Sequence, residues 1–161
     1  MLRLVSEITI EGDETWLFNA VHEVNIVQDV MSLTDTCEVQ LPKKIKWQNA
    51  VKNYEKPPVK RGDKISVNLA YDDELKTIFT GFIRSIDAKV PIVIKCEDGM
   101  FLLKQQAAKP KAYKNASLKE IITDLLAGTG IEFKLVDDNL KIGKYRITRK
   151  TVSEELQELK E

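Results

Sequence analysis

The sequence predicts a mainly β protein with an α+β addition: a small antiparallel β-barrel followed by a helix–strand–strand–helix module of the α/β type. Two observations predict this class. Through the first part of the chain, apolar and polar side chains alternate with a period of two, as in half-buried strands. Near residue 113 the spacing changes to that of amphipathic helices. We therefore expect a barrel (1–103), a linker (104–112) and an α/β module (113–161), and we expect that module to be incomplete by itself.

About six strands are expected in the barrel. The clearest is DKISVNLAY, in which Ile65, Val67 and Leu69 lie on one face and Lys64 and Ser66 on the other. The other expected strands are 4–10, HEVNIV (22–27), TCEVQLP (36–42), 77–88 and VPIVIKC (90–96). Many short strands separated by turns favour a barrel or a sandwich, and closing the sheet removes its exposed edges.

The segment 42–62 is the best candidate for a contact surface, because it is long and basic. Trp47, Val51 and Tyr54 recur at helical spacing, so a short helix is expected inside it. Three interpretations stay open: docking on an acidic protein, stacking on a nucleic acid, or a solvated loop whose Trp47 covers one end of the barrel. The candidate contact residues here are Lys43, Lys44, Lys46, Trp47 and Tyr54.

The expected α/β module begins with a well-marked helix. Ser117 and Glu120 have the spacing of a capping box, an apolar stripe follows, and Gly128 stands where a helix-ending glycine belongs. IEFKLV (131–136) and KIGKYRIT (141–148) are then expected to be strands.

The chain ends in a second expected helix. Thr151 and Glu154 have capping-box spacing, and an apolar stripe follows them. We expect that stripe to meet a neighbouring subunit, because two strands and two helices rarely cover their own apolar faces. The candidate contact residues of the stripe are Val152, Leu156 and Leu159.

Composition limits the function. The chain has 161 residues with 25 basic and 25 acidic side chains, and a neutral total argues against general nucleic-acid binding. Cys37 and Cys96 lie in alternating apolar runs without a CxxC spacing, so buried free thiols are expected. Neither a metal nor another cofactor is expected. The apolar runs are too short to span a bilayer, and the N-terminus does not resemble a signal peptide.

The strongest candidate for catalysis is the acidic pair Glu97 and Asp98, which ends a strand just before Gly99. Paired carboxylates can perform acid–base chemistry, but such work also needs a cleft and a third group. The single histidine, His22, is not tied to the pair by any sequence pattern. We expect the two carboxylates to be the polar end of a strand, and we expect no enzyme activity.

Four stretches, taken in order, resemble the N-terminal part of phage tail hub proteins. This is the baseplate-hub, late-control-D-like group, to which the type VI secretion spike hub is also similar. The stretches are VNIVQDVMSLTDTCEVQLP, VKRGDKISVNLAY, FTGFIRSIDAKVPIVIKCEDGMFLLK and SLKEIITDLLAGTGI. The third, with its F-x-G strand and its C-E-D end, is the most specific. The resemblance rests on order and spacing over roughly residues 15–160 rather than on a rigid motif.

The resemblance implies a structural protein. Members of the group form a trimeric ring between the tail tube and the spike, and their barrels mimic tube subunits. It therefore implies a virion tail protein assembled in the bacterial cytoplasm, with tube, spike and further copies of itself as partners. No membrane and no specific nucleic acid are expected as partners. The alternatives are an oligonucleotide-binding barrel that uses the 42–62 segment and, more weakly, a hydrolase that uses Glu97 and Asp98.

Overall fold

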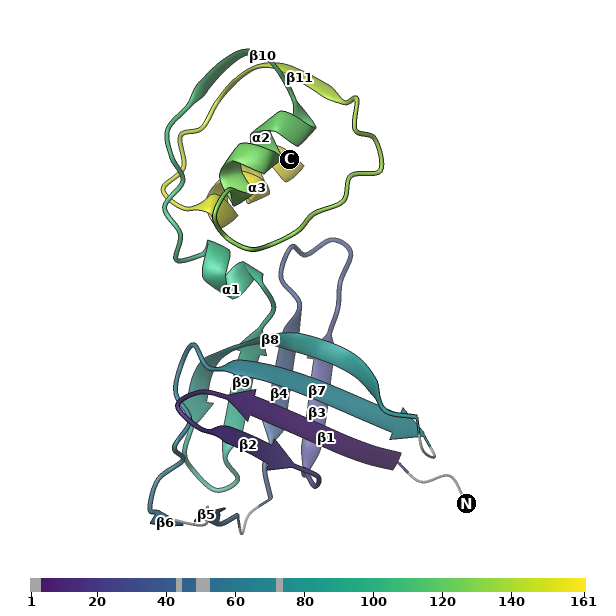
Figure 1. The fold of residues 1–161 in the computed structure, drawn as a ribbon, viewed down its shortest axis with the longest axis vertical. Coiled ribbons are helices and arrows are strands. Elements are labelled where there is room, and N and C mark those ends of the chain that lie inside the picture. Colours follow the sequence, from purple (N-terminus) through teal and green to yellow (C-terminus); the bar gives the residue numbers. More distant parts are fainter. Residues whose placement is uncertain (1–3, 43–44, 49–52, 72–73) are drawn as a thin grey trace. The chain divides into compact units, whose positions relative to one another are not determined.

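The computed structural model describes residues 4–42, 45–48, 53–71 and 74–161. The chain forms two compact units, Met1–Gly99 and Met100–Glu161 (Figure 1). The candidate contacts Lys43 and Lys44 lie outside the described residues. Each unit is described by itself below.

Unit 1 is built on one antiparallel sheet of seven strands, which confirms the predicted mainly β class. The strand order is β2-β1-β7-β8-β9-β4-β3. The strands are β1 (Leu4–Glu11), β2 (Thr15–Phe18), β3 (Glu23–Val27), β4 (Thr36–Gln40), β7 (Lys64–Tyr71), β8 (Lys76–Asp87) and β9 (Val93–Glu97). All six predicted strands are present, and the short strand β2 was not predicted.

The sheet is not closed into a barrel, so that part of the prediction is wrong. Among the described strands, β2 and β3 form the two edges and pair with one neighbour each. Figure 1 shows β3 and β4 running across the direction of β1 and β7, because the sheet twists strongly. Side chains from both edges, such as Phe18 and Ile26, pack on the same core. Both edges of the described sheet therefore contribute side chains to one core, without a ladder of hydrogen bonds between them.

The core of unit 1 follows the predicted alternation. Ile65 and Val67 of β7 are fully buried, while Lys64, the first residue of the strand, is exposed. Ile94 and Cys96 of β9 lie in the same core, as expected. Each fully buried aliphatic side chain stabilises the fold by about 1.5–3 kcal/mol. Burial of these side chains in one shared core is therefore the main contribution to the stability of the sheet.

The strands β8 and β9 approach each other closely at Gly81, the glycine of the F-x-G pattern. A Cβ atom added there would lie 2.1 Å from the backbone oxygen of Glu97. Real side chains do not tolerate this distance, and a backbone oxygen in a ladder cannot simply move aside. The glycine is therefore required by packing between two backbones.

The predicted helix inside residues 42–62 is wrong for the described part of that segment. Trp47–Gln48 (β5) and Asn53–Tyr54 (β6) are strands that pair with Trp47 opposite Tyr54. The aromatic spacing that suggests two helical turns also places both rings together across a hairpin. Packing of these rings on the core decides in favour of the hairpin, as shown below.

Unit 2 has the order helix–strand–helix–strand–helix. Its elements are α1 (Met100–Leu103), β10 (Ala112–Ser117), α2 (Leu118–Leu126), β11 (Lys141–Arg146) and α3 (Val152–Lys160). The antiparallel pair β10–β11 packs with α2 and α3 around a second apolar core (Figure 1). The core residues are Leu103, Ala108, Tyr113, Ala116, Ile121, Leu125, Leu126, Ile147 and Val152.

The predicted strand order of this module needs correction. Residues 131–136 are irregular, whereas β10 occupies the start of the module and the end of the expected linker. Phe133 is 38% exposed and Val136 is fully exposed, so the apolar alternation of this segment does not mark a buried face. The strand that pairs with β11 instead contributes Tyr113 and Ala116 to the core.

Both predicted helix starts are confirmed. The Ser117 side chain accepts a hydrogen bond from the Glu120 backbone N–H at 3.2 Å. Thr151 and Glu154 form a complete capping box at the start of α3. Gly128, with φ of 79°, takes the left-handed conformation after α2 that was expected of a helix-ending glycine.

Candidate functional site

The acidic pair that ends β9 makes folding contacts. Glu97 is 4% exposed and forms an ion pair with Arg84 of β8, with a distance of 3.1 Å between Nη1 and Oε1. Asp98 accepts a hydrogen bond from the Asp35 backbone N–H at 3.1 Å, and its own N–H donates to the Asp35 carbonyl at 3.1 Å. His22 precedes β3 and lies beside the other end of β4, where its backbone N–H donates to the Gln40 carbonyl. The two carboxylates and the histidine therefore do not converge on one point.

The contact with Asp98 holds one end of the loop that joins β3 to β4, residues 28–35, here called the 28–35 loop. Within it, the Asp29 side chain accepts from the Met31 backbone N–H at 2.9 Å. The Ser32 hydroxyl donates to the Thr34 carbonyl at 3.0 Å and accepts from the Thr34 N–H at 3.2 Å. These local bonds give the loop a defined shape without a hydrophobic core of its own.

The tip of the 28–35 loop carries two apolar side chains that are held out in solvent. Val30 is 97% exposed and Met31 is 73% exposed. Single exposed apolar residues are ordinary on a protein surface. Two adjacent ones at the tip of an ordered loop form a small apolar patch that a partner can bind. A preformed loop also loses little conformational entropy when a partner binds. This loop tip was not predicted from the sequence, because alternation identifies strands, whereas Val30 and Met31 stand between two polar turn sequences.

The aromatic residues of the 42–62 segment form a cluster inside unit 1. Trp47 is 5% exposed and lies edge-to-face against Trp16 and Phe18, with ring centroids 5.3 and 5.2 Å apart. Tyr54 lies edge-to-face against Trp16 at 5.7 Å and donates from its hydroxyl to Glu14 at 2.6 Å. Such pairs contribute about 0.5–1.5 kcal/mol each beyond burial.

This cluster decides what the segment can do. The Trp47 ring is buried in the core of unit 1, so its face is not available to stack on a nucleic-acid base. Lys46 beside it is exposed. The indole N–H groups of Trp16 and Trp47 have no hydrogen-bond acceptor among the described residues. An edge-to-face arrangement allows a ring face to act as a weak acceptor for such a group.

In unit 2, two tyrosines attach the helices to the small sheet. Tyr113 of β10 and Tyr145 of β11 are register partners on the two strands. Tyr113 donates its hydroxyl to Asp124 of α2 at 2.6 Å, and Tyr145 donates to Glu155 of α3 at 2.5 Å. Burial, followed by these hydrogen bonds, raises the pKa of both phenols. Each ring therefore stays a neutral donor that positions one helix.

Asp124 has a second partner. The Lys111 ammonium lies 2.5 Å from its carboxylate and 4.8 Å from the centre of the Tyr113 ring. The hydrogen bond from Lys111, followed by that from Tyr113, lowers the pKa of Asp124. This carboxylate is thus kept ionised by a fixed cation and a fixed hydroxyl.

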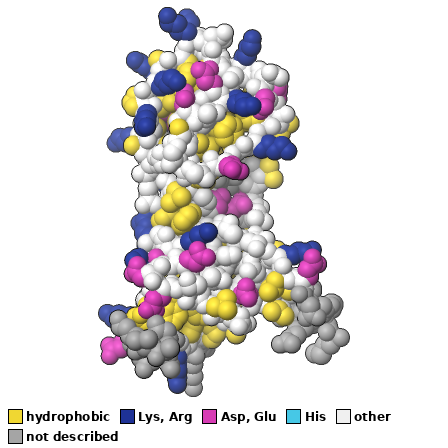
Figure 2. All heavy atoms as spheres, viewed as in Figure 1, with side chains coloured by type: hydrophobic (Ala, Val, Ile, Leu, Met, Phe, Trp, Pro, Cys, Tyr) yellow, Lys and Arg dark blue, Asp and Glu magenta, His cyan; other side chains and the backbone are white. Residues whose placement is uncertain are grey.

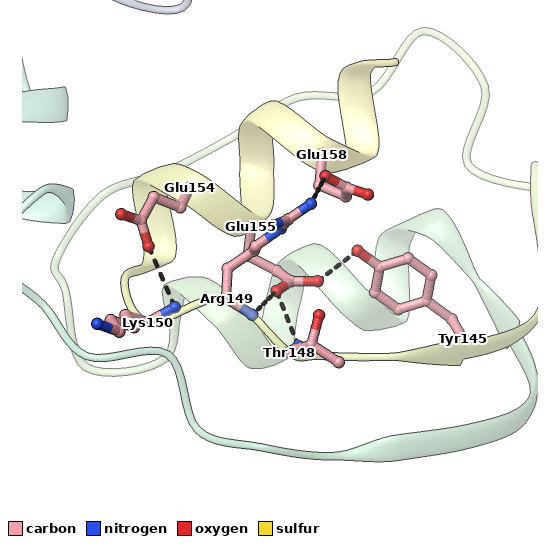
Figure 3. A network of polar contacts seen from close by, with 7 residues as sticks. All are labelled: Tyr145, Thr148, Arg149, Lys150, Glu154, Glu155 and Glu158. Carbon is pink, nitrogen blue, oxygen red and sulfur yellow. Dashed lines mark hydrogen bonds and ion pairs between the residues drawn. The ribbon is translucent and has the colours of Figure 1, made fainter.

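Glu155 is the most deeply buried charged side chain in the described part of unit 2, at 1% exposed. One carboxylate oxygen accepts from the Tyr145 hydroxyl, and the other accepts from the backbone N–H groups of Thr148 (3.0 Å) and Arg149 (2.8 Å). Figure 3 shows the carboxylate reaching from α3 into the turn before that helix. Arg149 also pairs with Glu158 one turn further along α3. The network fixes the turn between β11 and α3.

The candidate contacts of the last helix are mostly used inside unit 2. Val152 is 1% exposed and belongs to the core. Leu156 and Leu159 are half-buried and pack against that core. Only part of the expected stripe therefore remains accessible to a neighbour.

The surface carries both charge signs. On the face shown in Figure 2, basic and acidic side chains are interspersed rather than separated. In the described ranges, no group of three or more His, Cys, Asp or Glu side chains is arranged to hold a metal ion. The helices of the described residues are all too short or too polar to cross a membrane.

Comparison with known proteins finds similarity in structure alone. No protein-family model matches the chain, and no curated protein matches it in sequence. Solved structures share its fold, and two of them are described as tail proteins. The 43 kDa tail protein of prophage MuSo2 from Shewanella oneidensis matches with a TM-score of 0.64 and 14% identity. The tail protein from Neisseria meningitidis MC58 matches with a TM-score of 0.62 and 16% identity.

The matches extend through nearly the whole chain. They cover 96% and 92% of it, but only 47% and 43% of the respective tail proteins. The chain thus spans less than half the length of these two structural neighbours. The likeness establishes a shared fold, and a shared fold does not by itself carry a function.

Proposed function

We propose that this chain is a structural part of a phage-type tail, with a role in assembly rather than in catalysis. The observation that carries the proposal is the match of almost the entire chain to two proteins described as tail proteins. The sequence pattern supports it independently, since four ordered stretches resemble phage tail hub proteins. The two lines of support use different information, namely backbone geometry and residue order.

The finer proposal is a hub at the tail tip, between the tube and the spike, with a trimer formed by the full-length protein. It rests on the resemblance of the F-x-G strand and the C-E-D strand end to the hub group. The folding roles of these residues are consistent with it: Gly81 admits the backbone of β9, and Glu97 and Asp98 fix β8 and the 28–35 loop. A source in a phage, a prophage or a secretion machine fits equally well.

In this proposal the 28–35 loop contacts a neighbouring tail subunit. Val30 and Met31 lie at the tip of a loop shaped by its own hydrogen bonds, so they can enter an apolar hollow at small entropic cost. Methionine adapts to the shape of such a hollow because its side chain is unbranched. Burial of two side chains of this size stabilises a contact by about 3–6 kcal/mol before the costs of association are subtracted.

The proposal is tested with the complete gene product that contains this chain. Val30→Ser with Met31→Ser is expected to reduce the yield of assembled tails, counted by electron microscopy, without lowering the melting temperature. Val136→Ser, at another fully exposed apolar residue, serves as the matched control and is expected to assemble normally. Normal assembly of the double variant would refute the loop contact. Absence of the wild-type protein from purified tails would refute the tail role itself.

A further inference from the structure

The two cysteines of the chain face each other across neighbouring strands. Cys37 of β4 and Cys96 of β9 are register partners, and both are free thiols. Each is 2% exposed, and both belong to the core of unit 1, so their side chains are on the same face of the sheet. The sequence places them 59 positions apart and gives no sign of this pairing.

The hydrogen bonds around the pair define its spacing. The Leu41 N–H donates to Ile92 at one end of the β4–β9 ladder, and the Asp98 N–H donates to Asp35 at the other. Hydrogen-bonded pairs alternate with non-hydrogen-bonded pairs along an antiparallel ladder, and the register here has no bulge. Counting by twos from either end makes Cys37 and Cys96 a hydrogen-bonded pair.

That spacing allows a disulfide but does not favour it. The Cα atoms of a hydrogen-bonded pair are about 5.5 Å apart, which is within the range that disulfides span. Their Cβ atoms are about 5.5 Å apart, whereas a disulfide needs about 3.8 Å. The strands must therefore approach locally, so a bond formed here is strained and more easily reduced than a relaxed one.

We propose that Cys37 and Cys96 are a redox-sensitive dithiol, at which a peroxide closes a reversible cross-strand disulfide between β4 and β9. In the first step the thiolate of one cysteine attacks hydrogen peroxide. The O–O bond breaks, and a sulfenic acid and one water form. The second sulfur then attacks the sulfenic sulfur, an S–S bond forms, and a second water leaves. Two thiols are oxidised and one peroxide is reduced to two waters.

Burial makes the reaction slow. It raises the pKa of Cys37 to about 12 and that of Cys96 further, so both thiols are protonated at neutral pH. An oxidant therefore reaches the thiols only when the sheet opens locally near its edge. β4 is separated from the edge by β3 alone, and the cysteine pair lies one residue from the start of β4 at Thr36. Local opening of this end exposes the thiols without global unfolding.

The disulfide ties the β3–β4 hairpin, and with it the 28–35 loop, to β9. A reducing cytosol keeps the dithiol open, whereas prolonged exposure to an oxidising medium closes it. This chemistry is a property of unit 1 and does not depend on the proposed tail function.

The test uses the wild-type chain, folded, with hydrogen peroxide as the oxidant. After reaction for hours, intact-mass measurement is expected to show a loss of about 2 Da, the mass of the two hydrogen atoms removed. Non-reducing digestion is expected to give one linked peptide pair containing Cys37 and Cys96, and dithiothreitol is expected to restore both thiols. The melting temperature of the oxidised chain is expected to rise by about 5 °C, since the bond closes a long loop but is strained.

Three results would overturn the proposal: two titratable thiols after treatment of the folded chain, sulfinic acid as the main product, or dimers linked between chains. A matched control is Cys96→Ala, which leaves Cys37 without its partner and is expected to show no loss of about 2 Da. If this variant does not fold, wild-type chain oxidised in denaturant provides the comparison. There both thiols are exposed, so the linked pair is expected to form faster than in the folded chain; a linked pair that forms in denaturant and never in the folded chain would also count against the proposal.

Discussion

The buried carboxylate of Glu155 gives the sharpest test of how unit 2 is held together. Replacing Glu155 by Gln keeps the shape of the side chain and removes its charge. The amide oxygen can still accept from the backbone N–H groups of Thr148 and Arg149, and the amide nitrogen faces the Tyr145 hydroxyl. Three charge-assisted hydrogen bonds therefore become neutral ones.

The magnitude follows from those three bonds. A hydrogen bond to a charged group contributes about 1.5–3 kcal/mol and a neutral one about 0.5–1.5 kcal/mol, so each exchange costs about 1 kcal/mol. We expect Glu155→Gln to lower the free energy of unfolding by about 3 kcal/mol. Part of this loss is offset, because burying a neutral side chain costs less desolvation free energy than burying a charged one. For a unit of this size that corresponds to a fall in melting temperature of about 10 °C or more.

The assay is thermal unfolding followed by circular dichroism, together with hydrogen exchange of the backbone amides of Thr148 and Arg149. Glu158→Gln is the matched control, since Glu158 belongs to the same helix but is 46% exposed and pairs with Arg149 at the surface. Exposed pairs of this kind contribute little, so no measurable change is expected for it. If Glu155→Gln matched the control in melting temperature and in exchange, the assigned role of the buried carboxylate would be wrong.

Two further predictions concern packing and pH. Gly81→Ala is expected to destabilise unit 1 by about 3 kcal/mol or more, because the new Cβ would overlap the Glu97 backbone oxygen and push β9 from β8. Thr80→Ala at the neighbouring exposed position is the control in chemical denaturation, and equal midpoints for the two variants would contradict this reasoning. Asp124→Asn is expected to lower the melting temperature at pH 7, and by less at pH 2. The folded pKa of Asp124 is held below its ordinary 3.8 by Lys111, so its contribution is present above that value and is lost as the pH falls through the folded pKa. A difference between wild type and variant that is the same at both pH values would speak against a role for the ionised carboxylate.

The strands of unit 1 were predictable because one of their faces is buried. Alternation identifies such a strand directly, as with Ile65 and Val67 or Ile94 and Cys96. Closure of the sheet was not predictable in this way. Whether two edges pair depends on twist and on long-range packing, and here Trp16, Trp47 and Phe18 fill the space near the edge strand β2. A period-two pattern contains no information on that packing.

The unit 2 errors have a different physical origin. The segment 131–136 alternates as a strand does, but its apolar residues Phe133 and Val136 are exposed and no described strand pairs with it. The real partner of β11 is the polar stretch Ala112–Ser117, whose strand conformation depends on the contacts of Tyr113 and Ala116 with the helices. Helix starts were predictable because a capping box is a local interaction between residues three apart.

The candidate site was predictable in part. The sequence directed attention to Glu97 and Asp98. The structure gives Glu97 a partner in Arg84, 13 residues away along the chain, and Asp98 a partner in Asp35, 63 residues away. Trp47 and Tyr54 were expected as contact residues at helical spacing, whereas the structure pairs them across a hairpin and places them in an aromatic cluster with Trp16. The loop tip at Val30 and Met31 could not be weighed from sequence, because exposure of an apolar residue is a property of the folded surface.

We propose that this chain is a structural part of a tail. The most direct measurement is mass spectrometry of tail particles purified from the source strain, with quantification of peptides from residues 1–161 against those of the tube protein. The claim predicts that these peptides are present in intact particles at a fixed ratio, with three copies per tail if the hub position is right. Their absence from particles, in cells that express the protein, would contradict the claim.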